Sequence, residues 1–215
     1  MTERGVLVGP DGLARCSWAL SAPDYLPYHD TEWGRPLHGD DLLYERMTLE
    51  SFQSGLSWLT ILRKRENFRA AFDRFSITAV ADYQQRDVDR LLADAGIVRN
   101  RAKIEAAITN ARAALELPDG LDALLWSFAP EPARRAAVST LAELPAKTAE
   151  SIAMAKALKR SGFVFLGPTT CYAMMQAVGI VDDHLAGCYA SSATAKAPIA
   201  KAPIAETPAA ETPAG

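Results

Sequence analysis

Apolar side chains recur at helical spacing along much of the chain. Residues 99–117 place five of them on one face of a helix: Ile104, Ala107, Ile108, Ala111 and Leu115. Residues 148–161 repeat the pattern with Ile152, Ala155 and Leu158. Spacings of three and four residues put side chains on the same side of an α-helix. No stretch shows the competing alternation of a half-buried strand, so the pattern predicts an all-α bundle.

Polar residues and glycines divide the chain into short helices. Start signals stand at Asp40, Ser57, Asp87 and Thr148, and stop signals at Gly96, Gly162 and Gly179. Pro168 follows Gly167 directly, where a helix would begin. The run from there to residue 178 is apolar on nearly every side. We therefore expect this last helix to be central in the bundle.

One acidic residue interrupts an apolar stripe in residues 42–58. Leu43, Met47, Glu50 and Ser54 fall on one line of a helix, so a carboxyl group occupies a stripe meant for the interior. Either Glu50 is paired with a polar partner inside the fold, or it faces a pocket and accepts hydrogen bonds from a ligand. Five large aromatic residues nearby could line a flat cavity or pack in the core: Trp18, Tyr25, Tyr28, Trp33 and Trp58.

Composition and charge are those of an ordinary globular chain. The 215 residues are 49% hydrophobic and 23% charged, with a formal net charge of −3. This charge argues against a protein that coats nucleic acid through bulk positive charge. Three basic clusters could still form a local nucleic-acid face, or simply solvated helix faces: Arg63 to Arg65, Arg99 to Lys103, and Lys156 to Arg160.

The chain divides into three parts. We expect a flexible N-terminus over residues 1–12, one folded domain over residues 13–190, and a disordered tail over residues 191–215. The tail repeats Ala-Lys-Ala-Pro-Ile-Ala and Glu-Thr-Pro-Ala and holds no aromatic residue. The N-terminal segment does not read as a signal peptide, and no apolar run reaches the roughly 20 residues of a membrane span. We therefore expect a cytoplasmic protein with no membrane partner.

Two cysteines and two histidines could form a metal site. Cys16 and His29 lie near the start, and His184 and Cys188, four residues apart, could face one way on a helical turn. Two thiolates and two imidazoles are a zinc-binding set. Spacing alone favours ordinary unliganded residues, because the two halves lie far apart in sequence. Three cysteines are too few for a disulfide framework, and the third, Cys171, is expected in the core.

A tight turn separates the last two predicted helices. Residues 163–170 run Phe-Val-Phe-Leu-Gly-Pro-Thr-Thr and lead into the apolar helix. The N-terminus of a helix presents backbone N–H groups and partial positive charge, so it can bind a phosphate. Gly167, Thr169 and the preceding Lys159 are the candidate contacts at this turn.

Longer motifs resemble a known family. Cys16-Ser-Trp, Tyr28-His-Asp-Thr-Glu-Trp-Gly34, the segment Leu49-Glu-Ser-Phe-Gln-Ser-Gly-Leu-Ser-Trp58 and Gly179-Ile-Val-Asp-Asp-His184 are similar to motifs of the 3-methyladenine DNA glycosylase I family. The resemblance runs from about residue 16 to residue 188. It implies an all-helical helix-hairpin-helix DNA glycosylase that excises 3-methyladenine from alkylated double-stranded DNA and releases the free base.

The resemblance also implies roles for individual residues. The zinc ligands fall on Cys16, His29, His184 and Cys188, so the family's pattern reverses the expectation from spacing. Glu50 would accept hydrogen bonds from the purine edge, Trp58 would stack on the ring and Tyr28 would contribute a hydroxyl. The remaining aromatic wall would be Trp18, Tyr25 and Trp33. Residues in the turn after the Glu50 helix would fill the gap left in the DNA stack: Gln53, Gly55 and Leu56.

Three positions bear on the chemistry. Asp182 matches the register of an aspartate that supports the sugar cation in the wider superfamily, so we hypothesise a catalytic role. Its alternative role is capping a helix or bonding to neighbours of the zinc site. Phe165 stands where the hairpin usually has its first glycine, which predicts a less regular turn. Thr169 replaces the nucleophilic lysine of lyase-active relatives, which predicts a monofunctional enzyme that uses water. We separately expect a monomer.

Two other functions remain open from the sequence. A zinc-stapled helical module could recognise DNA damage without cutting it. A glycosylase of the same fold could also act on another lesion, such as 3-methylguanine or a mismatched adenine. The pocket residues Glu50, Tyr28 and Trp58 favour the enzyme, because a binding module has no need for a carboxyl group at that place.

Overall fold

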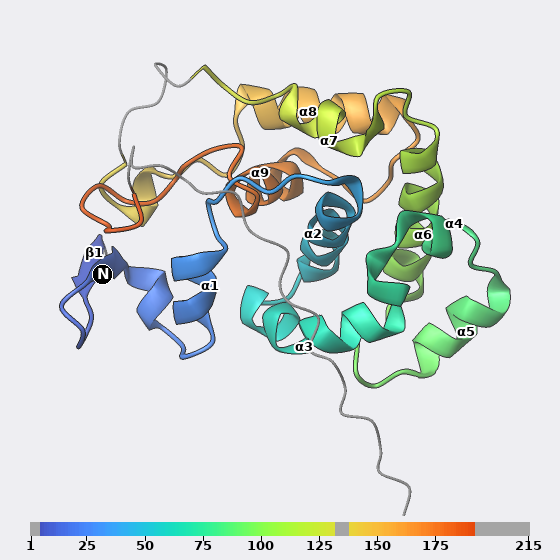
Figure 1. The fold of residues 1–215 in the computed structure, drawn as a ribbon, viewed down its shortest axis with the longest axis horizontal. Helices are drawn as coiled ribbons and strands as arrows, with labels where there is room; N and C mark the ends of the chain where they lie inside the picture. Colours follow the sequence, from blue (N-terminus) through green and yellow to red (C-terminus); the bar gives the residue numbers. More distant parts are fainter. Residues whose placement is uncertain (1–4, 132–137, 192–215) are drawn as a thin grey trace, which may run out of the picture.

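The computed structural model describes residues 5–131 and 138–191, and these form a mostly helical fold (Figure 1). The helical prediction is confirmed. The α-helices are α1 (Tyr25–Thr31), α2 (Asp40–Gln53), α3 (Trp58–Ala71), α4 (Ile77–Ala81), α5 (Gln85–Ala93), α6 (Arg101–Leu115), α7 (Gly120–Trp126), α8 (Ala149–Arg160) and α9 (Pro168–Ala177). Short 3-10 helices are η1 (Ser17–Leu20), η2 (Asp73–Phe75) and η4 (Leu141–Glu143). The tail predicted from residue 191 lies almost wholly outside the described residues.

Helix α2 lies at the centre of the bundle beside α9 (Figure 1). Residues 43–52 of α2 are all buried, and helices α3, α4, α6, α7 and α9 pack around it. Several of these buried residues are polar, including Arg46 and Glu50. Helix α9 is also central, as predicted, and Cys171 is fully buried in it. The core helix of this protein therefore carries charged side chains at depth, and these need partners or a function.

Two short strands at the N-terminus were not predicted. β1 (Val6–Val8) pairs antiparallel with β2 (Ala14–Cys16), in a register that places Val6 opposite Cys16. Strands of three residues are too short for alternation to show in the sequence. β1 falls inside residues 1–12, where we expected a flexible segment. Within the described ranges, no helix combines the length and apolar character needed to cross a membrane.

Helix ends follow capping chemistry, with shifts of a few residues. Ser57 caps α3 and Thr148 caps α8, as predicted. Asp40 is instead the first residue of α2, after Gly39, and Asp87 is the third residue of α5, where its carboxyl group closes a capping box with Gln84. A carboxylate in the first turn serves the same unpaired N–H groups as a cap.

The turn between α8 and α9 is irregular at the predicted place. Phe165 has a φ of +61°, in the left-handed region that favours glycine, and its side chain is half exposed. The side chain of Asn110 on α6 holds the turn: its Oδ1 accepts from the Val164 N–H at 2.8 Å, and its Nδ2 donates to the Val164 carbonyl at 3.1 Å. A third helix thus fixes the hairpin that joins α8 to α9.

Candidate active site

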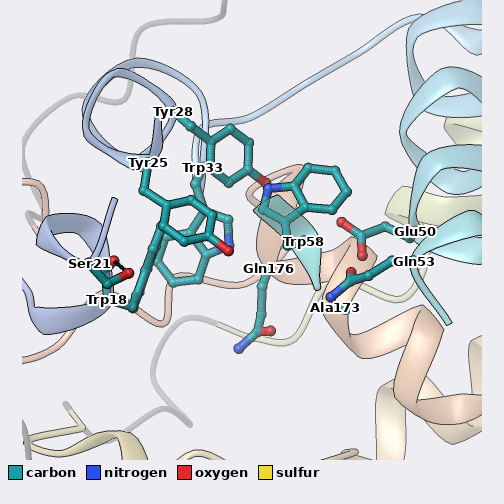
Figure 2. A pocket seen from close by; sticks show the side chains of 10 residues that line it. All are labelled: Trp18, Ser21, Tyr25, Tyr28, Trp33, Glu50, Gln53, Trp58, Ala173 and Gln176. Carbon is teal, nitrogen blue, oxygen red and sulfur yellow. Dashed lines mark hydrogen bonds between the residues drawn. The ribbon is translucent and has the colours of Figure 1, made fainter. Parts of the chain in front are cut away.

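A cavity of about 360 Å³ lies between the N-terminal segment and helices α2, α3 and α9 (Figure 2). This volume is in the range of small-molecule binding sites. Ten residues line it: Trp18, Ser21, Tyr25, Tyr28, Trp33, Glu50, Gln53, Trp58, Ala173 and Gln176. All five aromatic residues predicted from the sequence are among them. They form a wall around the cavity, and Tyr28 and Trp58 also pack against the core.

The aromatic rings support one another through edge contacts. Trp18 lies edge-on to Tyr25 and to Trp33, with ring centroids 5.6 and 5.1 Å apart. Tyr28 and Trp58 are 5.4 Å apart and tilted by 43°. Edge-on aromatic contacts are favourable, and each fixes the plane of its neighbour. The wall is therefore already arranged to receive a flat ring.

Glu50 faces this cavity from α2, beside Gln53 (Figure 2). The side chain is buried, with 6% of its surface exposed. Burial raises the pKa of its carboxyl group to about 7, and the positive charge of Arg46 opposes that rise. Within residues 5–131 and 138–191, no hydrogen bond or ion pair to this carboxyl group is formed. Of the two readings of Glu50, the structure supports the pocket-facing one.

A network of ion pairs lies next to the wall. Glu32, just after α1, accepts from Arg65 at 2.5 and 2.9 Å and from Arg46 at 3.2 Å. Arg46 also donates to the Tyr28 hydroxyl at 3.4 Å. Burial raises the pKa of Tyr28, so its phenol stays protonated at neutral pH. Arg46 and Glu32 were not predicted as part of the site.

Sequence analysis also missed Ser21, Ala173 and Gln176. The Gln176 Nε2 donates to Asp183 Oδ2 at 2.8 Å, and the Tyr172 hydroxyl donates to the same oxygen. The hydrogen bond to Asp183 therefore fixes the orientation of the Gln176 amide. Its signal in the sequence was weak, because a single glutamine on an apolar helix is as easily a surface residue. Ala173, three residues earlier on α9, shares its face.

The turn between α2 and α3 carries the residues predicted to enter the DNA stack. Gly55 has a φ of +82°, and Leu56 is 43% exposed. Lys103 on α6 supports the turn, because its Nζ donates to the carbonyls of Phe52 and Ser54 at 2.8 and 2.6 Å. The third predicted residue, Gln53, lines the cavity instead of the exposed part of the turn.

The other predicted DNA contacts lie around the α8–α9 turn. Gly167 caps α9, and Thr169 lies exposed in its first turn. Lys159 is exposed in the last turn of α8. None of these three lines the cavity. They form a surface element separate from the pocket.

Three of the four predicted metal ligands lie together. The ligand atoms of Cys16, His29 and Cys188 are within 4.8 Å of one another, and all three side chains are buried. The fourth, His184, has its ring centroid 5.1 Å from that of His29. Its Nε2 is buried and has no hydrogen-bond partner among the described residues. An orphaned imidazole nitrogen beside two thiols and a second imidazole fits a metal ion, so these residues could hold one.

The other ring nitrogens of both histidines are held by carboxylates. His29 Nδ1 lies 2.8 Å from Asp30 Oδ1, and His184 Nδ1 lies 2.7 Å from Asp182 Oδ1. Such contacts orient a metal-binding imidazole and leave Nε2 free for the ion. The pKa of the Cys188 thiol is lowered because it shares a hydrogen bond with Cys16. The thiolate is the form that binds a metal.

Two expectations about this segment change. His184 and Cys188 do not lie on a helical turn, because α9 ends at Ala177 and the chain after it forms irregular turns. Gly179 begins this segment with a φ of +72° in close contact with the Arg35 backbone, where a Cβ atom would come within 2.4 Å of the Arg35 carbonyl carbon. Asp182 binds His184 and does not line the cavity.

Replacing Glu50 by Gln should stabilise the folded protein at neutral and alkaline pH. The folded pKa of about 7 lies above the unfolded value of about 4.3, so the folded state binds more protons between them. The free energy of unfolding of the unchanged protein should therefore fall as pH rises through this window. E50Q should be more stable by about 3–4 kcal/mol at pH 8 and nearly equal at pH 4. Urea unfolding at several pH values measures this difference.

Glu45→Gln provides the matched control. Glu45 is also buried on α2, but it forms an ion pair with Arg69 at 2.7 Å. Its loss leaves a guanidinium without its partner, so E45Q should be less stable than the unchanged protein. An E50Q variant that loses stability at pH 8 as E45Q does would show that the Glu50 carboxyl has an internal partner.

Comparisons with known proteins agree with this site. The methyladenine glycosylase family model matches residues 18–191. DNA-3-methyladenine glycosylase 1 of Escherichia coli (strain K12) is 46% identical over 179 residues, which cover 82% of this chain and 96% of that protein. DNA-3-methyladenine glycosylase of Haemophilus influenzae is 43% identical over 177 residues, covering 81% and 96%.

A solved structure of a relative has the same fold. It is titled as the structural basis of 3-methyladenine recognition by 3-methyladenine DNA glycosylase I from Staphylococcus aureus. Its TM-score is 0.78 at 34% sequence identity, and the match covers 83% of this chain and 96% of that one. With the family model spanning most of the described fold, this chain belongs to the methyladenine glycosylase family.

Proposed function

We propose that this protein hydrolyses the N-glycosidic bond of 3-methyladenine in alkylated double-stranded DNA. The observation that carries the proposal is the buried, unpaired carboxyl group of Glu50 in the wall of an aromatic cavity. The relatives from E. coli and H. influenzae are named for this activity, and the S. aureus structure concerns recognition of this base. A binding module without catalysis is not favoured, because these relatives are named as glycosylases.

Cleavage of the glycosidic bond of 3-methyladenine needs little help from the protein. Methylation at N3 makes the adenine ring cationic, so the base is a good leaving group. The C1′–N9 bond breaks with its electron pair going to the base, which departs neutral, and a water oxygen bonds to C1′ with loss of a proton. The remaining tasks are to turn the nucleotide out of the duplex and to reject normal adenine.

The cavity residues fit these two tasks. Glu50 accepts hydrogen bonds from the purine edge, and its negative charge attracts the cationic ring. Trp58 stacks on the ring, and Tyr28 offers a hydroxyl. A cationic ring against indole gains about 1–2 kcal/mol that neutral adenine lacks, when the contact is desolvated. The cavity therefore selects by charge as well as by shape.

The exposed turn between α2 and α3 is positioned to replace the flipped nucleotide. Leu56 is the exposed apolar residue of this turn, and Lys103 holds the backbone on which it stands. Apolar wedges of this kind enter base steps in many DNA-bending proteins. Gly167, Thr169 and Lys159 at the α8–α9 turn bind a phosphate of the backbone, through N–H groups and positive charge.

Cys16, His29, His184 and Cys188 form a structural zinc site. Two thiolates and two imidazoles would supply all four ligands of a structural zinc ion and leave no position for substrate. A zinc ion held by these side chains would join β2 and α1 to the segment after α9, and these two parts of the chain also share a small apolar cluster around Leu185. Asp182 orients His184 in this arrangement, which assigns it to the metal site and not to the bond being broken.

The activity is tested by incubating the purified protein with methylated DNA and identifying the released base by mass spectrometry. We expect 3-methyladenine as the main product, and release reduced at least tenfold in Glu50→Gln. Borohydride should trap no covalent DNA adduct, because water and not an amine attacks the sugar. Release no faster than in a protein-free sample would contradict the proposal, and a trapped adduct would contradict its hydrolytic step.

The role of the α2–α3 turn is tested with two exposed leucines. Leu56→Ala should slow excision from duplex DNA by about tenfold, because the gap in the stack is no longer filled. Leu115→Ala is the matched control, since Leu115 is 52% exposed at the end of α6, away from the cavity. Single-turnover rates on one duplex give the comparison. Equal rates for the two variants would remove the turn from the mechanism.

The metal site is tested by metal analysis and thermal unfolding. The purified protein should contain about one zinc ion per chain, and Cys188→Ala should lose it and unfold at a temperature at least 10 °C lower. Cys171→Ala should keep the ion, because Cys171 lies in the core away from the cluster. Asp182→Asn should release zinc more readily but leave excision by the zinc-loaded protein unchanged. Undiminished zinc in Cys188→Ala would overturn the site.

A further inference from the structure

Arg46 is a buried cation behind the aromatic wall. It lies on α2 one turn before Glu50, and its side chain is 7% exposed. The guanidinium carbon is 5.5 Å from the ring centre of Tyr28 and 5.9 Å from that of Trp58. Both rings line the cavity, whereas Arg46 does not. Arg46 can therefore influence the cavity only through the residues between them, such as Tyr28 and Trp58.

Arg46 does not have a carboxylate of its own. Glu32 is held by Arg65 through both carboxylate oxygens and accepts a single, longer bond from Arg46. One negative charge thus serves two guanidinium groups, and one buried positive charge remains uncompensated. Glu50 is four residues further along the same helix, where side chains are neighbours. Its ionised form supplies the missing charge.

The same guanidinium fixes the Tyr28 hydroxyl. Arginine has only donors, so the Tyr28 oxygen accepts the bond from Arg46. The hydroxyl proton must then point away from the guanidinium. Figure 2 shows the Tyr28 hydroxyl beside Trp58, on the side of the cavity where Glu50 lies. A proton directed there can be donated to a ring in the cavity or toward the Glu50 carboxylate.

We propose that Arg46 is a positioning residue of the site: it favours the ionised form of Glu50 in the free enzyme and turns the Tyr28 hydroxyl proton away from the guanidinium. This inference rests on the proposed function and explains how a buried carboxyl group with no direct partner is still partly ionised at neutral pH. Arg46 sits behind the wall, so it achieves this without occupying the cavity. Loss of Arg46 would leave Glu50 protonated at neutral pH, with one acceptor replaced by a donor.

Other charged groups around α2 do not take this role. On the cavity side, α1 contributes Tyr28 and is followed by Glu32, and α3 contributes Arg65. Helix α9 presents Ala173 and Gln176, which do not titrate, while Asp183 behind them binds Tyr172 and Gln176. Lys103 of α6 is bound to the carbonyls at the end of α2. The acidic groups near α4, α7 and η2 are bound away from Glu50. Asp41 accepts from the Ile77 N–H and Asp122 from the Gly39 N–H, both at the start of α2, and Asp73 accepts from the Tyr83 hydroxyl.

The test compares pH profiles of excision by Arg46→Met, Arg46→Lys and the unchanged protein. For Arg46→Met, the acid limb of kcat/KM should move to higher pH by at least one unit, giving about a tenfold loss at pH 6.5 and near-recovery at pH 9. Arg46→Lys should restore most of the profile, because it keeps the charge. Arg69→Met, which breaks another ion pair between α3 and α2, should leave the profile in place.

A second readout does not depend on activity. Carbon-13 NMR of the glutamate carboxyl groups follows the titration of Glu50, and Glu50→Gln assigns its resonance. The titration midpoint should be higher in Arg46→Met than in the unchanged protein and close to it in Arg46→Lys. An unmoved midpoint, or an equal loss of excision at every pH, would overturn the proposal.

The design separates this inference from the proposed function. Arg46→Met leaves Glu32 bound to Arg65, so it creates no new unpaired buried ion. Should Met not be tolerated, Arg46→Gln removes the charge and keeps a donor to Tyr28, and the same midpoint shift is expected. If the unchanged protein releases no 3-methyladenine, the proposed function fails, while the NMR midpoint still decides the role of Arg46.

Discussion

The site depends on one buried carboxyl group that the fold does not neutralise. Glu50 lies on helix α2, in which residues 43–52 are all buried, and burial raises the pKa of its carboxyl group to about 7 because the interior disfavours the charged form. A shift of this size corresponds to about 3 kcal/mol, a large part of the 5–15 kcal/mol that stabilises a typical domain. Helix α2 can carry this cost because the surrounding residues 43–52 are otherwise well packed. The packing of α2 in the core thus fixes the position of the Glu50 carboxyl group, and the cavity is the place where a ligand could contact it.

The other half of the cavity depends on the N-terminal segment. Trp18, Tyr25, Tyr28 and Trp33 all come from residues 17–33, which lie to one side of the bundle beside the segment after α9 (Figure 1). The rings of this wall touch the proposed metal ligands: Trp18 is 5.2 Å from His29, and Trp33 is 4.7 Å from His184, measured between ring centres. A metal ion at this cluster would therefore fix the wall of the cavity, although it would take no part in the bond cleavage.

The sequence predicted those residues of the site that depart from the expected pattern of apolar and polar positions. Glu50 was visible as a charge in an apolar stripe, and the aromatic residues were visible by their number near it. The proposed metal ligands could be predicted only through the family resemblance, because 171 residues separate Cys16 from Cys188 in the sequence. Gln176 and Arg46 were missed, since a polar residue on a helix carries no sign of which neighbour it meets. The strands were missed because three residues give no periodicity.

In the proposed function, the charge of Glu50 that destabilises the folded free enzyme also gives the site its selectivity. Neutral adenine entering the cavity would displace water from the Glu50 carboxylate and offer no counter-charge, so the group would take up a proton or remain strained. A cationic base supplies the counter-charge and restores the ordinary preference of the carboxyl group for its ionised form. Recovering even half of about 3 kcal/mol favours the methylated base by about tenfold before any contact with the methyl group. In the proposed function, discrimination against neutral adenine therefore begins with the ionisation of Glu50, and the shape of the cavity adds to it.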